Sequence, residues 1–145
     1  MAEPVMEFKD EQQLCSSLKE WQERLFLTDW TIKATLVDFS EVVYENYKDV
    51  CGDNTYNSVN QFTVIRVIRH NDEMRSRIQK CCHEKTLVHE LLHLKLHFPI
   101  VGTFESSNLD QRIHTFIDQM AKSFIMAKYD LPFDWFKNFK ESDEG

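Results

Sequence analysis

The sequence predicts an α+β domain in which helices stack on a small sheet of two to four strands. Apolar residues recur at helical spacing in three segments, and two segments between them have the alternation and β-branched content of strands. The 145 residues, 42% of them hydrophobic, are enough for one domain with its own core. We therefore expect a single domain over residues 1–145, with frayed ends at about 1–8 and 141–145.

The first half of the chain predicts one helix and at least two strands. Residues 11–27 predict an amphipathic helix whose apolar face carries Leu14, Leu18, Trp21, Leu25 and Phe26. Residues 30–37 alternate as a strand does. Residues 42–44 predict a short strand and residues 51–54 a turn. The strongest strand pattern is at 60–68, with Phe62, Val64, Arg66 and Ile68 on one face and Thr63, Ile65 and Val67 on the other.

The second half predicts two long helices. After a polar loop or short helix at 70–79, one helix runs from about 83 to 96, with Pro99 just past its end. The last runs from about 109 to 127, and its apolar face carries Ile113, Ile117, Met120, Ala121 and Phe124. We expect the aromatic residues that follow, Phe133, Trp135, Phe136 and Phe139, to fold back over the core.

The helix at 83–96 contains the motif His89-Glu90-Leu91-Leu92-His93. A spacing of four places both imidazoles on one face, about 6 Å apart along the axis, where they can bind one metal ion. Glu90 is turned off that axis and can meet a metal-bound water as a general base for hydrolysis. The alternative is a core helix whose histidines happen to lie four apart. A helix among leucines has little reason to carry three such groups, so we favour a Zn²⁺ site.

A catalytic zinc usually has three protein ligands, so a third must be found. His97 continues the series, but a helix cannot bring three residues spanning two turns onto one ion, and it fits the helix end better. Glu105 and Asp110 are carboxylates in the right region, but each could equally be an ordinary charged surface residue. We favour His114 on the last helix, with Asp118 four residues on to orient a metal-bound imidazole. The alternative is a core-edge histidine bonded to Asp118.

Three blocks of sequence extend this interpretation. They are Trp21, Leu25, Leu27, Asp29, Trp30 and Ile32; the run 86–94 around the motif; and the helix that contains Ala121. Over about 21–124 the chain resembles the small zincin-like metallopeptidases of bacterial and phage genomes, and the motif is the specific part of that resemblance. Gluzincin-like members carry a Glu ligand on the last helix. Their pattern puts His114 at that position, with Asp118 and Ala121 at the matching offsets.

The resemblance implies a zinc peptidase that cleaves a peptide or protein substrate, with His89, His93 and His114 as ligands and Glu90 as the base. His replaces the Glu ligand of the family, so two alternatives stay open. The third ligand could be Glu105 or Asp110, or the site could have lost its catalytic activity. In the second case the chain would be a binding or regulatory module that keeps its metal. A strand at 61–68, if it lies at the sheet edge, would hold an extended peptide. A residue that stabilises the oxyanion is also expected. The candidates are Tyr56, His70 and Tyr129, and none of them is preferred.

Composition limits the partners and the location. The net charge of −7 offers no electrostatic footprint for nucleic acid or an anionic membrane. No apolar run approaches the roughly 20 residues of a membrane span, and the start of the chain lacks the pattern of a signal peptide. The four cysteines show no C-x-x-C spacing, and adjacent Cys81 and Cys82 are poorly placed to pair with each other. We therefore expect reduced thiols and a cytoplasmic protein.

Overall fold

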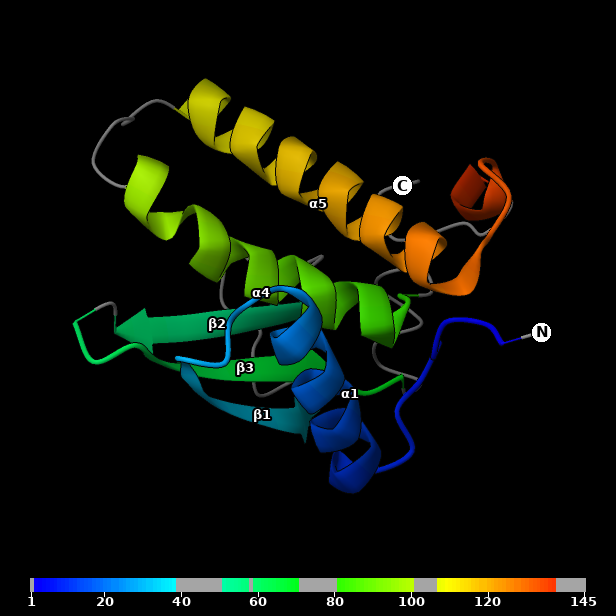
Figure 1. Cartoon of the computed structure of the whole chain (residues 1–145), viewed down its shortest axis with the longest axis horizontal. Coiled ribbons are helices and arrows are strands. Elements are labelled where there is room, and N and C mark those ends of the chain that lie inside the picture. The colour runs from blue at the N-terminus through cyan, green and yellow to red at the C-terminus, as the bar shows by residue number, and fades with distance from the viewer. Residues whose placement is uncertain (1, 39–50, 58, 71–80, 101–106, 138–145) are drawn as a thin grey trace.

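A three-stranded sheet and three long helices make up the described part of the chain, which comprises residues 2–38, 51–57, 59–70, 81–100 and 107–137 of a computed structural model. Figure 1 shows their arrangement. The elements are α1 (Glu11–Arg24), β1 (Thr31–Val37), β2 (Gly52–Asn57), β3 (Phe62–Ile68), α4 (His83–Ile100), α5 (Ser107–Tyr129) and a 3₁₀ turn at Trp135–Lys137. The α+β class is confirmed.

The sheet has the strand order β1-β3-β2, with β1 parallel and β2 antiparallel to β3. One prediction is wrong here, and the condition set for peptide binding is not met. Residues 51–54 do not form a turn, because Gly52, Asp53 and Asn54 pair with β3 as the start of β2. The strand at 61–68 is central rather than at an edge, so its backbone groups are already bonded on both sides and cannot receive a peptide. The predicted strand at 42–44 and residues 71–79 of the predicted polar segment lie outside the described residues.

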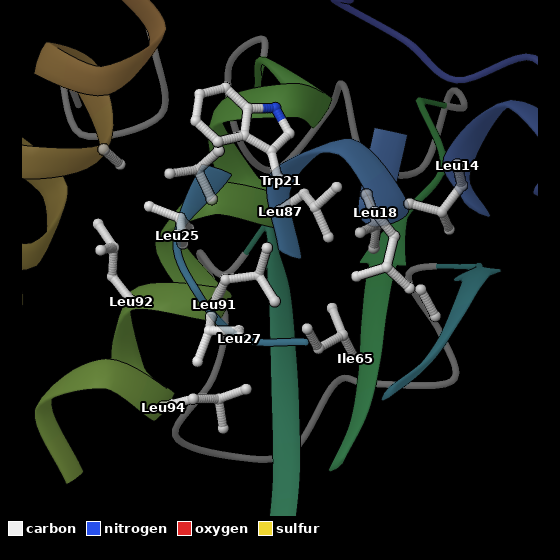
Figure 2. Packing of buried hydrophobic residues seen from close by; sticks show 14 of the residues in the cluster. Leu14, Leu18, Trp21, Leu25, Leu27, Ile65, Leu87, Leu91, Leu92 and Leu94 are labelled. Carbon is white, nitrogen blue, oxygen red and sulfur yellow. The ribbon is translucent and has the colours of Figure 1, made fainter. Parts of the chain in front are cut away.

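Helices α1 and α4 cover one face of the sheet, and α4 lies between the sheet and α5 (Figure 1). The burial pattern of β3 follows the predicted alternation, with Thr63, Ile65 and Val67 buried, and Ile68 is buried as well. Figure 2 shows side chains of the core. The core includes Leu14, Leu18 and Trp21 of α1, Ile65 of β3, Leu87, Leu91 and Leu94 of α4, and Ile117, Ala121 and Ile125 of α5. Burial of each large apolar side chain stabilises the fold by about 1.5–3 kcal/mol.

The helix ends differ from the predicted ones. The Asp10 side chain caps α1 by accepting the backbone N–H of Gln13 at 2.8 Å. The helix ends at Arg24, before residue 27, because Phe26 adopts a left-handed conformation with φ 57°. Helix α4 continues to Ile100. Beyond α5, Phe136 packs against the core as expected, but Phe133 is 82% exposed and does not.

The N-terminal segment is anchored to the start of α4, where the composition alone predicted a frayed end. The Val5 N–H donates to Glu84 Oε1 at 2.9 Å, and the Phe8 N–H donates to His83 Nδ1 at 2.9 Å. Because Nδ1 of His83 accepts, its Nε2 carries the proton and donates to the Ile68 carbonyl at 2.8 Å. His83 thus joins the N-terminal segment, α4 and β3.

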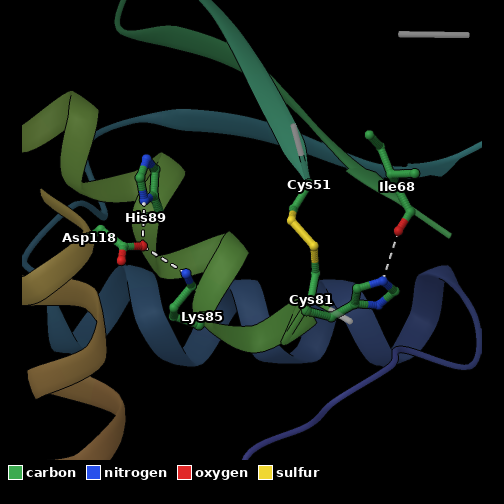
Figure 3. The surroundings of a disulfide bond; sticks show 7 residues. Cys51, Ile68, Cys81, Lys85, His89 and Asp118 are labelled. Atoms are coloured by element: carbon green, nitrogen blue, oxygen red, sulfur yellow. Dashed lines mark hydrogen bonds and ion pairs between the residues drawn. A yellow bond between two sulfur atoms is a disulfide. The ribbon is translucent and has the colours of Figure 1, made fainter. Parts of the chain in front are cut away.

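A disulfide joins Cys51, just before β2, to Cys81, two residues before α4, with their Cα atoms 6.2 Å apart (Figure 3). The prediction of reduced thiols is wrong for this pair, whereas Cys15 and Cys82 are free. Disulfides persist mainly in oxidising compartments, so this bond argues against the expected cytoplasmic location. No helix in the described ranges has the length and apolar character needed to cross a bilayer.

Candidate metal centre

Three histidine side chains from two helices come together between α4 and α5. His89 and His93 lie one turn apart on α4, and α5 runs antiparallel to α4 (Figure 1). His114 lies in the first half of α5. One potential ligand atom from each residue lies within 4.8 Å of the others. The ring centroids are 5.2 Å apart for His89 and His93, 4.9 Å for His93 and His114, and 6.1 Å for His89 and His114. The three histidines therefore form a group that can hold a metal ion.

The donor set and its spacing fit a zinc ion. Three nitrogens at 2.0–2.1 Å from a tetrahedral zinc would be about 3.3 Å apart, so the ligand atoms, which lie within 4.8 Å of one another, would have to move closer together to bind one ion. Burial, and to a smaller extent the neighbouring charges of His89 and His114, lower the pKa of His93 to about 3. His93 is therefore neutral at physiological pH, the form in which an imidazole binds a metal.

Asp118 lies on α5 one turn after His114, with its Oδ1 3.5 Å from Nδ1 of His89 (Figure 3). Asp118 was expected to orient a metal-bound imidazole, and the one that it contacts is His89 of α4. Lys85 Nζ lies 2.7 Å from the same Oδ1, and Lys122 Nζ lies 3.2 Å from Oδ2. Burial alone would raise the pKa of Asp118, but the hydrogen bond with His89 and the two lysine charges outweigh it and hold that pKa below its usual range. Asp118 is therefore a carboxylate acceptor.

Glu90 is buried, with 8% of its surface exposed. The Asn54 side-chain amide, on β2, donates to Glu90 Oε1 at 2.8 Å and to the Glu90 backbone carbonyl at 3.1 Å. The pKa of Glu90 is raised to about 7, mainly by burial and to a smaller extent by the charge of Asp53, and these effects outweigh the opposing ones of His89, Asn54 and Lys85. A carboxyl group with this pKa can both accept and release a proton near neutral pH.

Asn54 was missed in the sequence because residues 51–54 have the composition of a turn. The register of β2 pairs Asn54 with Ile65, and Gly52 with Val67, which places these β2 residues on the face that α4 covers. A Cβ on Gly52 would lie 2.6 Å from the Arg66 carbonyl and 2.8 Å from Cγ2 of Thr86, so only glycine allows this close approach of β2 to α4. No sequence signal for Asn54 exists without the strand pairing.

Two of the other predicted residues, Tyr129 and His70, lie away from this group. Tyr129 donates its hydroxyl proton to Glu84 near the opposite end of α4, and the His70 ring lies 4.2 Å from that of His83. Neither is placed to stabilise an oxyanion beside the three histidines. Glu105 lies outside the described residues. Tyr56, His97 and Asp110 lie in described helices or strands, but the structure does not describe their side chains.

Comparisons with protein-family models, curated proteins and solved structures find no match to this chain. Support for a function therefore comes from the geometry of the site and from the motif itself.

Proposed function

We propose that this chain is a zinc-dependent metallopeptidase in which His89, His93 and His114 bind the metal and Glu90 is the general base. The observation that carries the proposal is that one potential ligand atom from each of the three imidazoles lies within 4.8 Å of the others, with Glu90 adjacent in sequence to His89. An all-histidine set is well known among zinc hydrolases and leaves a fourth position for water or substrate.

The chemistry divides between the ion and the chain. Bound to the three imidazoles, zinc would acidify a water molecule and polarise the scissile carbonyl. Glu90 would accept the proton from the attacking water and then donate it to the leaving amine. Its raised pKa, near 7, suits both roles, and Asn54 holds Oε1 so that the carboxyl group has a defined orientation. The Asp118 carboxylate would orient the His89 ring.

The substrate would be an extended peptide bound along β2. Among the described strands, β1 and β2 form the two edges of the sheet, and β2 is the edge that contacts Glu90 through Asn54. An edge strand has backbone N–H and C=O groups available for strand addition, which gives affinity without restricting the side chains of the peptide. This replaces the central strand β3, which the sequence suggested for the same role.

The test is zinc content and hydrolysis in the unaltered protein and in Glu90→Gln. The protein should bind one zinc per chain and cleave an unstructured protein such as labelled casein. Glu90→Gln should keep the zinc but lose hydrolysis by about 10²–10⁴-fold, because the proton acceptor is gone. His114→Ala should lose zinc and hydrolysis together. A zinc-free protein, or full hydrolysis by Glu90→Gln, would refute the proposal.

The second candidate is a binding module that keeps the metal without turnover. It is favoured by His114 in the position where the resembling peptidases carry Glu. For such a module, the unaltered protein would bind zinc but show no hydrolysis of any peptide, and Glu90→Gln would leave the affinity for its partner unchanged.

A further inference from the structure

Lys85 is a buried lysine on α4, one turn before His89, and only 9% of its surface is exposed. Its Nζ lies 2.7 Å from Oδ1 of Asp118, the same oxygen that lies 3.5 Å from Nδ1 of His89 (Figure 3). One carboxylate oxygen on α5 thus contacts two side chains of α4, a lysine and a proposed metal ligand.

A lysine at this place is unfavourable on charge alone. Burial of an ammonium group costs several kcal/mol unless the charge is paired. A positive charge close to the three histidines also repels a divalent cation and therefore opposes metal binding. A buried lysine here therefore needs a favourable interaction that offsets these costs. The contact of its Nζ with Oδ1 of Asp118 provides one.

We propose that Lys85 is a positioning residue that holds Oδ1 of Asp118 where it accepts the Nδ1 proton of His89, which leaves Nε2 of His89 to bind the metal. A hydrogen bond at one ring nitrogen sets which nitrogen carries the proton and fixes the ring direction. The proposal rests on the three-histidine metal site of the proposed function, and it adds a residue that the motif itself does not contain.

The sign of the change in zinc affinity separates this proposal from simple electrostatics. Lys85→Met removes a positive charge, so charge alone predicts tighter zinc binding. Loss of positioning predicts zinc binding about 10–100-fold weaker, the usual cost of removing a group that orients a ligand. Zinc affinity is measured by competition with a chromophoric chelator, so no substrate is needed. Equal or tighter binding by a folded Lys85→Met would overturn the inference.

Lys122→Met is the matched charge control. It removes the same charge from the same carboxylate, but its contact is with Oδ2, at 3.2 Å, whereas Lys85 contacts the oxygen that faces His89. Its zinc affinity should stay the same or rise. If both lysine variants weaken zinc binding equally, the effect is not specific to Oδ1 and the inference fails. Lys85→Arg, which keeps a charged donor, should bind zinc more tightly than Lys85→Met.

A double-mutant cycle tests the route through Asp118. If Lys85 acts through that carboxylate, Lys85→Met should weaken zinc binding in the native background, but in Asp118→Ala it should leave zinc binding unchanged or tighten it. An equal loss in both backgrounds would show that Lys85 acts in another way. Circular dichroism and thermal unfolding of each variant identify any that fail to fold.

A measurement on the unaltered protein keeps the inference testable if Lys85→Met does not fold. Nitrogen-15 NMR of the zinc-free protein should show His89 with its proton on Nδ1; a proton on Nε2 would overturn the inference. If the unaltered protein binds no zinc, the proposed function fails and this inference with it. If it binds zinc and Lys85→Met binds equally well, only this inference fails.

Discussion

Helix α4 carries two buried glutamates six residues apart, and their surroundings differ sharply. Glu84 is fully buried and receives four donors. Its Oε1 accepts from the Val5 N–H and the Tyr129 hydroxyl, and its Oε2 accepts from the Trp21 indole at 2.8 Å and Lys128 Nζ at 2.7 Å. These contacts bring the N-terminal segment, α1 and α5 onto the start of α4.

Glu90 is almost as buried, but its carboxylate receives the Asn54 amide as its side-chain donor within the described part of the chain. Burial therefore raises its pKa to about 7. The comparison teaches that burial alone does not define the role of a carboxylate. A buried charge with all its donors present serves as a structural anchor, whereas one with few donors and a shifted pKa is typical of a functional site.

The same substitution at the two positions should have opposite effects on stability. Glu84→Gln removes a charge that pairs with Lys128 and leaves donors unsatisfied, so the free energy of unfolding should fall by about 3–5 kcal/mol. Glu90→Gln should leave that free energy unchanged or raise it, because burial already disfavours the charged form. Urea unfolding of the zinc-free proteins at pH 7.5 measures both. Equal losses at the two sites would invalidate the comparison.

The start of α4 should also make stability depend on pH through His83. Burial lowers its pKa to about 3, with a smaller contribution from the charge of His70 and an opposing one from the Ile68 carbonyl. The folded pKa lies below the unfolded value of about 6.5, so the unfolded chain binds the proton more readily. The neutral His83 therefore makes its full contribution to the free energy of unfolding above pH 6.5, and that contribution is lost as the pH falls from 6.5 toward 3.

At pH 5 this linkage should cost about 2 kcal/mol relative to pH 7.5, because the unfolded His83 is protonated there and the folded one is not. Urea unfolding at the two pH values measures the loss, and His83→Gln is the control because it cannot titrate. That variant should show a loss smaller by about the same amount. A loss as steep as in the unaltered protein would contradict the assignment to His83.

The contact between β2 and α4 should depend on the absence of a side chain at Gly52. Gly52→Ala places a Cβ against the Arg66 carbonyl and Thr86, so we expect a loss of about 1–3 kcal/mol from overpacking. Thermal unfolding gives the size of the effect. Thr86→Ser removes the methyl group but not the carbonyl, so the double variant should recover only part of the loss. Full recovery would show that the strand backbone adapts freely.

The smallest effect is expected at Asn54. Asn54→Ala removes the two hydrogen bonds to Glu90 and should cost about 1 kcal/mol of stability, with lower hydrolysis at unchanged zinc content. Thr55→Ala, at an exposed position on the same strand, should change stability by less than about 0.5 kcal/mol. If the two variants behave alike, Asn54 has no particular role in holding Glu90.

Local patterns in the sequence were sufficient for the three long helices, for β1 and β3, and for the pairing of His89 with His93. These features depend on spacings within a single element. His114 required the likeness to a family pattern, since its distance from the motif in sequence carries no geometry. The expectation for β2 failed because its residues resemble a turn and form a strand only through pairing with β3. Asn54, Lys85 and the disulfide depend on contacts between elements, which no local pattern contains.

The Cys51–Cys81 cross-link has a practical consequence for handling the protein. It closes a loop with a sequence separation of 30 residues, and the loss of unfolded-chain entropy from such a closure is worth about 3–4 kcal/mol. Dithiothreitol added to keep the exposed Cys15 thiol from dimerising would also cut this link, three residues before Asn54. In samples prepared with reductant, β2 would then be held less rigidly beside Glu90 than in samples without it. Activity assays on the two kinds of sample could not be compared directly.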